Sequence, residues 1–227
     1  MTQGVSRRDY TGDPFSEDGL LATPYAQATA WIADARARAE SADDVPEPMA
    51  ISVATVDEQG LPDVRTVLLR FAEPEGWGFV TGLTSTKARQ LAAHPVAAAS
   101  LTWPAMFRAI RIRGRVEELA SQQVRDYFQS RPWASRISAW TSEQSAPVAT
   151  RAVLEDRYAE IARRFPDTGS PDDVPVPPHW GGYRIVPDEV EFWAGRPDRL
   201  HDRLVFTRTR PGTMAQADAW SLHRRQP

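Results

Sequence analysis

Apolar residues recur along this chain at two different spacings, which separate the expected helices from the expected strands. Over residues 24–39 they return every three or four positions, as on one face of an amphipathic helix. Thr23 followed by Pro24 is typical of a helix N-cap and the first helical position, so a helix is predicted over 24–39. Further helices are predicted over 85–93, 121–130 and 151–165.

The expected strands are short stretches in which apolar and polar residues alternate, or apolar runs between turn residues. In residues 109–118, isoleucine and valine alternate with arginine, which is typical of an antiparallel strand with one buried face. The remaining strands are predicted over 50–56, 64–71, 77–81, 96–103, 182–187, 189–193, 202–207 and 219–223. Residues 132–150 show no clean period, and residues 1–23 are expected to form a flexible N-terminal arm.

These elements do not alternate between strand and helix in the way that produces a parallel sheet. Hairpin-connected strands with a few helices instead predict a mainly β fold, an antiparallel barrel with peripheral helices packed on its outside. We expect residues 24–227 to form a single domain.

Composition narrows the class of protein. The chain has 227 residues, of which 41% are hydrophobic and 25% charged, as in soluble globular proteins. A net charge of −3 argues against a general nucleic-acid binder but permits a local basic site. The absence of cysteine excludes disulfides and thiol catalysis. No apolar run approaches the roughly 20 residues that span a bilayer, and the N-terminus lacks a secretory signal, so we expect no membrane partner and a cytoplasmic location.

The densest group of chemically capable side chains lies in residues 191–203. Arg199, His201 and Arg203 alternate there, so an extended backbone would point all three to one face. Two guanidiniums and an imidazole on one face suit a phosphorylated ligand, because they would otherwise repel one another. The alternative is a charged edge strand that keeps the protein soluble, with Asp198 and Asp202 as counter-ions.

A second candidate anion site lies between an expected strand and an expected helix, in residues 81–87. Thr81 begins this hydroxyl-rich segment, Ser85 can cap the helix, and the amides of the first helical turn attract anions. Lys87 would be unfavourable so close to the helix N-terminus unless an anion were present. A phosphate site is therefore predicted, with a simple capped turn as the alternative. The segment lacks GxxxxGK[ST], so it is not a nucleotide P-loop.

Two arginines bracket the apolar strand over 64–71. Arg65 and Arg70 could hold a phosphate or a carbonyl through their planar guanidiniums, or they could cap the strand at the surface. In the weaker segment 142–145, Gln144 and Ser145 can hydrogen-bond a ring or a phosphate, although an ordinary polar loop looks the same.

A further group of phosphate-binding residue types follows the helix expected over 121–130. Tyr127, Arg131 and Ser135 are spaced four apart, but Pro132 should break the helix after Arg131. The break would let a phenol, a guanidinium and a hydroxyl converge between two helices. The alternative is a terminated helix with a half-buried tyrosine.

Other catalytic classes lack their signatures. The four histidines show no metal-ligand spacing, so no catalytic metal is expected, and no serine lies in a GxSxG motif. Several phosphate-type sites with aromatic residues, but without a strong nucleophile or base, indicate an enzyme whose cofactor supplies the chemistry.

Taken in order, these segments resemble the pyridoxine/pyridoxamine 5′-phosphate oxidase family. The ordered set, more than any one piece, carries the resemblance. The matching pieces are residues 65–70, 79–87, 127–132, 139–145, 180–184 and 191–203, with residues 7–10 resembling the family's N-terminal arm.

The resemblance implies an FMN-binding split β-barrel homodimer with FMN at two sites on the dimer interface. The residues implied to contact FMN are Arg65, Val67, Leu68, Thr81, Ser85, Lys87, Gln144, Ser145, Trp193 and Arg203. Those implied to bind the substrate phosphate are Arg70, Tyr127, Arg131 and Ser135. Arg199 and His201 would lie over the substrate's pyridine ring as the catalytic pair, and Arg7 with Tyr10 would close over it.

The implied reaction oxidises pyridoxine 5′-phosphate or pyridoxamine 5′-phosphate to pyridoxal 5′-phosphate. The substrate's 4′ carbon would give a hydride to the flavin, and dioxygen would accept the electrons and be released as hydrogen peroxide.

Three positions depart from the family's usual residues: Arg70 replaces lysine, Thr86 replaces a flavin-phosphate arginine, and Ala109 replaces glutamine. These departures keep open a phenazine-biosynthesis type of oxidase with a larger aromatic substrate, and a split-barrel protein that binds its ligand without turnover.

Overall fold

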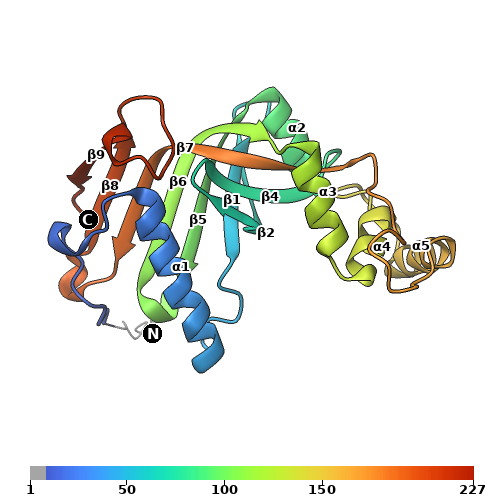
Figure 1. Cartoon of the computed structure of the whole chain (residues 1–227), viewed down its shortest axis with the longest axis horizontal. Coiled ribbons are helices and arrows are strands. Elements are labelled where there is room, and N and C mark those ends of the chain that lie inside the picture. Colours follow the sequence, from blue (N-terminus) through green and yellow to red (C-terminus); the bar gives the residue numbers. More distant parts are fainter. Residues whose placement is uncertain (1–8) are drawn as a thin grey trace, which may run out of the picture.

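The computed structural model describes residues 9–227, in which nine strands form one antiparallel sheet that curls around a core (Figure 1). The strand order is β2-β1-β5-β6-β7-β4-β3, and β8 and β9 continue the sheet from β7. The strands are β1 (Ala50–Val56), β2 (Pro62–Leu68), β3 (Phe71–Glu73), β4 (Gly76–Gly82), β5 (Val96–Trp103), β6 (Arg108–Glu118), β7 (Trp180–Ala194), β8 (Asp202–Arg208) and β9 (Trp220–Arg224). The predicted mainly β, antiparallel split-barrel fold with peripheral helices is confirmed.

Five α-helices accompany the sheet in the described part of the chain: α1 (Pro24–Ser41), α2 (Thr86–Ala93), α3 (Ser121–Ser130), α4 (Trp133–Thr141) and α5 (Arg151–Arg164). The predicted cap of α1 is confirmed, because the Thr23 hydroxyl accepts a hydrogen bond from the Ala26 amide at 3.1 Å. None of the helices within residues 9–227 has the length and apolar content needed to cross a membrane.

The long strand β7 corrects the prediction of two separate strands over 182–187 and 189–193. It runs without interruption through Pro187, pairing with β4 in its first half and with β8 in its second. The register between β6 and β7 shifts between Arg113 and Gly114, where Asp188 is the extra residue of a bulge in β7 next to Pro187, which has no N–H to give to the ladder. A Cβ on Gly114 would lie 2.1 Å from the carbonyl oxygen of Val186, so the bulge requires glycine.

The expected single strand over 64–71 is also wrong, because the chain changes partners within it. β2 ends at Leu68, after which the amide of Leu69 donates to Met49 and the amide of Arg70 donates to Gly78 on β4. Arg70 therefore lies where the chain passes from one side of the sheet to the other. A third difference concerns residues 132–150, where the structure contains α4 although the sequence shows no clean period.

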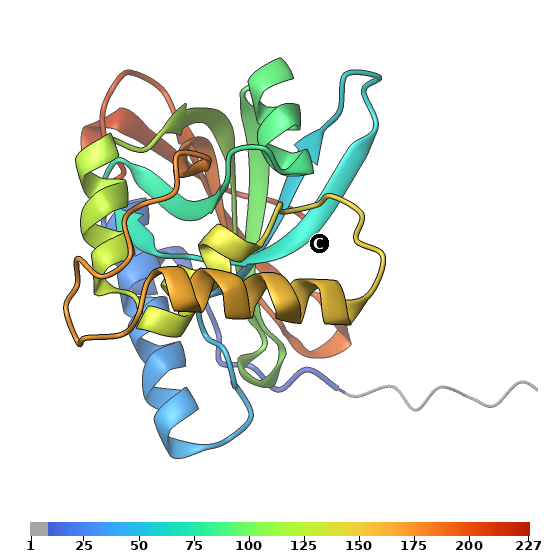
Figure 2. The same cartoon turned by 90° about the vertical axis from the view of Figure 1, so that its right-hand side faces the viewer.

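The core has two parts. The larger part lies between α1 and the sheet, where Trp31 packs edge-on against Phe192 with ring centroids 5.4 Å apart. The smaller part joins α3, α4 and α5 to the start of β7, around Phe128, Ile137 and Trp180. Figure 2 faces this helical end of the molecule. The division into an arm over 1–23 and a single domain over 24–227 stays a prediction.

Candidate functional site

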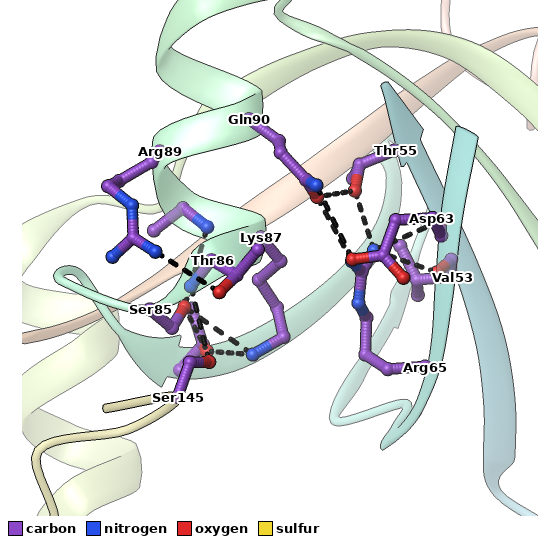
Figure 3. A network of polar contacts seen from close by, with 12 residues as sticks. Val53, Thr55, Asp63, Arg65, Ser85, Thr86, Lys87, Arg89, Gln90 and Ser145 are labelled. Carbon is purple, nitrogen blue, oxygen red and sulfur yellow. Dashed lines mark hydrogen bonds and ion pairs between the residues drawn. The ribbon is translucent and has the colours of Figure 1, made fainter. Parts of the chain in front are cut away.

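The buried ammonium of Lys87 is the centre of one group of polar residues at the start of α2. Its Nζ donates to Thr81 Oγ1 and Gln144 Oε1, each at 3.1 Å, and to Ser85 Oγ at 3.4 Å. Lys87 is only 6% exposed, and no carboxylate among residues 9–227 forms an ion pair with it. We call Thr81, Ser85, Lys87, Gln144 and Ser145 the Lys87 cluster, of which Figure 3 labels Ser85, Lys87 and Ser145.

Burial lowers the pKa of Lys87 to about 8, and the positive charge of Arg65 adds to this shift while Asp63 opposes it. The predicted cap of α2 is confirmed, since the Ser85 hydroxyl accepts from the Ala88 amide. A desolvated cation among neutral acceptors at a helix N-terminus is suited to an anion, because an anion would stabilise the charged form of the lysine.

The loop after α4 completes the Lys87 cluster from more than fifty residues further along the chain. Gln144 Oε1 accepts from the Thr81 hydroxyl at 2.6 Å and from the Gly82 amide at 3.1 Å. Ser145 Oγ accepts from the Thr86 amide at 3.2 Å. Ser145 has a φ of +73°, an uncommon conformation for a residue other than glycine, which indicates that tertiary contacts hold this loop against α2.

Arg65 lies beside the Lys87 cluster on β2 but is already engaged. Its Nη1 donates to Thr55 Oγ1 at 2.6 Å, its Nη2 donates to Gln90 Oε1 at 3.0 Å, and it forms an ion pair with Asp63 (Figure 3). Val67 and Leu68 follow it on the same strand. Sequence reasoning missed Asp63, although its place two residues before Arg65 puts both side chains on one face of a strand.

A second group surrounds Arg131 at the junction of α3 and α4. The predicted helix break is confirmed: α3 ends at Ser130, and Pro132 caps α4. The guanidinium of Arg131 lies 5.1 Å from the Trp180 ring, and Arg70 lies 5.7 Å from the ring of Tyr127. We call Arg70, Tyr127, Arg131 and Trp180 the Arg131 cluster.

The Arg131 cluster contains an unsatisfied donor. Nη1 of Arg131 is buried and has no hydrogen-bond partner within the described chain. Burial lowers the pKa of Arg131, Tyr127 opposes that shift and Arg70 adds to it. A buried guanidinium nitrogen without a partner carries a desolvation cost that an anionic ligand would offset. Ser135 lies half-buried in the first turn of α4, and its hydroxyl bonds to none of the described residues.

One cavity of about 210 Å³ joins these two clusters. Arg131 and Trp180 line it together with Thr81 and Gln144, the two residues whose oxygens accept from Lys87. The two anion-binding groups that the sequence predicts in separate segments therefore lie at one site.

A third group lies around His201. The imidazole packs against Trp193 and Tyr10, with ring centroids 4.7 and 5.1 Å away. Its Nδ1 accepts from the Arg196 amide at 3.1 Å, which leaves the proton of the neutral ring on Nε2. Burial lowers the pKa of His201, and Arg199 and Arg203 lower it further against the opposing Asp202. We call Tyr10, Trp193 and His201 the His201 cluster.

The expected alternation of Arg199, His201 and Arg203 on one extended face is wrong. Residues 197–199 form a 3₁₀ turn in which Asp198 and Arg199 have φ values of +55° and +61°, and β8 begins only at Asp202. Arg203 donates through Nε to Glu191 at 2.6 Å and pairs across the ladder with Trp193. Asp202, which the alternative interpretation offered as a counter-ion of this group, instead pairs with Arg196 and Arg224.

Within a single chain, the His201 cluster lies away from the Lys87 cluster and the Arg131 cluster. Figure 1 shows β8, which follows the turn, on one side of the sheet, and α2 and α4 toward the other. Arg7 lies outside the described residues. Among those described, no three histidine, aspartate or glutamate side chains gather as a metal ion would require.

Comparison with known proteins relates this geometry to a family. Residues 37–165 match the family model described as pyridoxamine 5′-phosphate oxidase. Residues 180–227 match the model described as the pyridoxine 5′-phosphate oxidase C-terminal dimerisation region. The chain belongs to the pyridoxine/pyridoxamine 5′-phosphate oxidase family.

Members of this oxidase family match along the whole chain. A pyridoxine/pyridoxamine 5′-phosphate oxidase from Kineococcus radiotolerans is 45% identical over 100% of both chains. One from Burkholderia ambifaria is 42% identical over 97% of both chains. Among solved structures, PhzG from Burkholderia lata 383 in complex with tetrahydrophenazine-1-carboxylic acid is 28% identical with a TM-score of 0.80, covering 95% of this chain and 99% of that one.

A pyridoxamine 5′-phosphate oxidase-related, FMN binding protein from Nostoc punctiforme shares the oxidase family's fold, with a TM-score of 0.64 at 20% identity over 87% of this chain and 96% of that one.

Two departures from the family's residues lie close to the clusters described above. Thr86 is at the first position of α2 and accepts through Oγ1 from Arg89, while Ala109 on β6 pairs with Trp193 on β7.

Proposed function

We propose that this protein is an FMN-dependent oxidase that converts pyridoxine 5′-phosphate or pyridoxamine 5′-phosphate to pyridoxal 5′-phosphate, with dioxygen as electron acceptor. The observation that carries the proposal is a pair of cations next to one cavity, the buried Lys87 and the half-buried Arg131 with its buried Nη1, neither of which has a carboxylate partner in residues 9–227. Two separate anionic groups at one site are what a flavin phosphate and a substrate phosphate would provide.

The Lys87 cluster fits the phosphate of FMN. It combines a buried ammonium, two hydroxyls and the N-terminal amides of α2, which are the donors that a phosphate requires. When bound, FMN would supply the two-electron acceptor that these side chains lack, and would pass the electrons to dioxygen. The proposed flavin contacts remain Arg65, Val67, Leu68, Thr81, Ser85, Lys87, Gln144, Ser145, Trp193 and Arg203.

The Arg131 cluster fits the phosphate of the substrate. The unpaired Nη1 of Arg131 has an open hydrogen-bonding capacity, and Arg70, Tyr127 and Ser135 are proposed to add a guanidinium and two hydroxyls. Oxidation of the substrate's 4′ CH₂OH to the aldehyde removes a hydride from carbon and a proton from oxygen. That reaction chiefly requires the carbon to be held near its acceptor, so fixing the phosphate and the ring is the main task of the protein.

Arg199 and His201 are proposed to act at the substrate ring, in a site shared between two copies of the chain. Because their own chain holds them away from Lys87 and Arg131, a second copy would supply them. The match of residues 180–227 to a dimerisation region supports such a homodimer. His201 would offer the proton on Nε2, and the permanently charged Arg199 would stabilise negative charge on the ring substituents. Tyr10 and Arg7 are proposed to cover the substrate.

The decisive experiment is a turnover assay on purified, FMN-reconstituted protein. We expect oxygen consumption with pyridoxine 5′-phosphate or pyridoxamine 5′-phosphate, with stoichiometric hydrogen peroxide and pyridoxal 5′-phosphate. Flavin-loaded protein that turns over neither vitamin phosphate would refute the proposal.

The second candidate is an oxidase of a larger reduced aromatic compound, as in phenazine biosynthesis. The structural similarity to PhzG of Burkholderia lata favours it. A tricyclic carboxylate without a phosphate would need a different partner for Arg131, whose open donor favours the vitamin phosphate. Comparing kcat/KM for a reduced phenazine carboxylate with that for pyridoxine 5′-phosphate separates the two candidates.

A further inference from the structure

The side chain of Arg89 folds back over the start of its own helix, α2. Its Nη2 donates to Thr86 Oγ1 at 3.1 Å (Figure 3). Its Nη1 donates to the carbonyl oxygen of Thr84 at 2.5 Å. The residue is exposed, and it forms no ion pair with any carboxylate in the part of the chain that the structure describes. An exposed arginine is free to extend into water, so this conformation brings its charge to the helix N-terminus.

That position is electrostatically unfavourable for an arginine when no anion is present. The N-terminus of a helix carries partial positive charge, and the first turn of α2 contains Lys87 but no acidic residue. Arg89 adds a second cation to the same turn. The arrangement becomes favourable when an anion lies in front of these donors.

A cavity of about 510 Å³ lies beside the Arg89 guanidinium. Arg89 and Thr84 line it from one side, and Gln144 and Ser145 of the Lys87 cluster line it from the other. One acid lines this cavity, Glu143, and it pairs with Arg157 on α5 at 3.4 Å.

We propose that Arg89 is a phosphate-binding residue of the FMN site and reaches the phosphate from the solvent side, opposite the buried Lys87. This inference rests on the proposed binding of FMN to the Lys87 cluster. A guanidinium has five N–H donors, of which two are used by Thr84 and Thr86, so three are left for phosphate oxygens. Because positions 86 and 89 are one turn apart on the same helix face, Arg89 supplies at Thr86 the guanidinium that this position lacks.

The test compares FMN with riboflavin, which has the same ring but no phosphate. Binding to apo-protein is measured through quenching of flavin fluorescence, without any activity assay. Arg89→Ala is expected to weaken FMN binding about tenfold, as for loss of one partly exposed charge-assisted hydrogen-bonding group, and to change riboflavin affinity less than about twofold. Arg36→Ala, which removes an exposed arginine of α1, is the matched control and should change neither.

Two further variants distinguish a role of the Arg89 guanidinium in FMN binding from a structural role of this side chain. Arg89→Lys should keep part of the FMN affinity, because it retains the charge but loses the planar pair of donors. Thr86→Arg in the Arg89→Ala background should restore FMN affinity, since it returns a guanidinium to the same helix end. Equal loss of FMN and riboflavin affinity in Arg89→Ala would overturn the inference and assign Arg89 a structural role.

The outcomes distinguish this inference from the function on which it rests. If the unmodified protein binds FMN tightly and Arg89→Ala binds it equally well, the inference about Arg89 is wrong and the FMN site stands. If the unmodified protein binds FMN no better than riboflavin, the phosphate site itself is refuted, and the inference with it.

Discussion

The ammonium of Lys87 donates to Oε1 of Gln144 at 3.1 Å, across 57 positions of sequence. A carboxylate at position 144 would neutralise the lysine and close the site to anions. The amide oxygen instead holds the ammonium in place and leaves its charge uncompensated. This choice of partner explains why burial lowers the pKa of Lys87 to about 8.

FMN affinity should therefore fall as pH rises above about 8. In the free protein Lys87 loses its proton near pH 8, whereas the bound phosphate favours the protonated lysine, so binding at higher pH must include proton uptake. The dissociation constant should rise by up to about tenfold per pH unit above 8, and Lys87→Met should remove that dependence. Fluorescence titrations between pH 6.5 and 10 measure both. A flat profile for the unmodified protein would contradict the assignment.

The same substitution should stabilise the protein without flavin. Below pH 8 the folded state carries a buried ammonium whose pKa lies below the ordinary lysine value of 10.5, so its charge opposes folding. Lys87→Met should raise the free energy of unfolding at pH 7 by up to about 3 kcal/mol, since one pKa unit corresponds to about 1.4 kcal/mol. The gain should shrink as pH rises from 8 to 10.5. Urea unfolding of apo-protein at pH 7 and pH 10 measures it, and a loss of stability at pH 7 would contradict it.

Substitution of Arg131 should weaken binding of the substrate phosphate and should not change the affinity for FMN. Arg131→Met keeps apolar contact with Trp180 but removes the buried guanidinium, so KM for pyridoxine 5′-phosphate should rise about ten- to hundredfold. FMN affinity should change less than about twofold. Steady-state kinetics and flavin titration on one preparation give both values. An equal loss of kcat/KM with a substrate that lacks phosphate would show that Arg131 has another role.

If the site is shared between two copies of the chain, as proposed, two inactive variants should complement each other. Lys87→Met chains and His201→Ala chains, co-expressed with different tags, should form mixed dimers in which one of the two sites is intact. An equal mixture should then recover about a quarter of the normal activity. If Lys87 and His201 of the same chain formed the site, every site in the mixture would be defective and no activity would return.

Arg199→Ala provides a separate check on catalysis. Because its proposed contact is with the substrate ring, kcat should fall much more than FMN affinity. Loss of flavin that accounts for the whole defect would show that its assigned role is wrong.

Local chemistry made part of the candidate site predictable. A helix cap depends on a few neighbouring residues, so Ser85 and the anion-favouring start of α2 could be inferred from residues 81–87 alone. Pro132 similarly predicted the break between α3 and α4. Both inferences needed only local backbone sterics and hydrogen bonding.

The elements that sequence reasoning missed depend on distant partners. The bulge that lets β7 continue through Pro187 requires the glycine that faces it on β6, Gly114, about seventy residues earlier, which no local pattern in β7 reveals. The positive φ values of Asp198 and Arg199 interrupt the extended backbone that the predicted alternation required, and no glycine marks that turn. Gln90 bonds to Arg65 from α2, so this partner became visible only in the folded chain.

The carboxylate of Glu191 offers a test of stability that is independent of any ligand. It is 3% exposed, and it accepts from Arg111 and Arg203 at 2.5 and 2.6 Å. Burial alone would raise the pKa of Glu191, but these hydrogen bonds and charges lower it, as they lower that of the neighbouring Glu189 to about 2.

Glu191→Ala should therefore lower the free energy of unfolding at pH 7 by about 1–3 kcal/mol, because the half-buried Arg203 loses its carboxylate partner and Arg111 keeps only Glu189. A lowered carboxyl pKa contributes stability above its ordinary value of 4.5 that is lost as pH falls through the lowered pKa, so the difference from the unmodified protein should be smaller at pH 2.5 than at pH 5. Glu117→Ala, which breaks the exposed pair with Arg115, is the matched control and should cost less than about 1 kcal/mol. Urea unfolding at the two pH values measures each difference. A Glu191→Ala deficit that stayed constant with pH would mean that lost packing, rather than the paired charge, accounts for its cost.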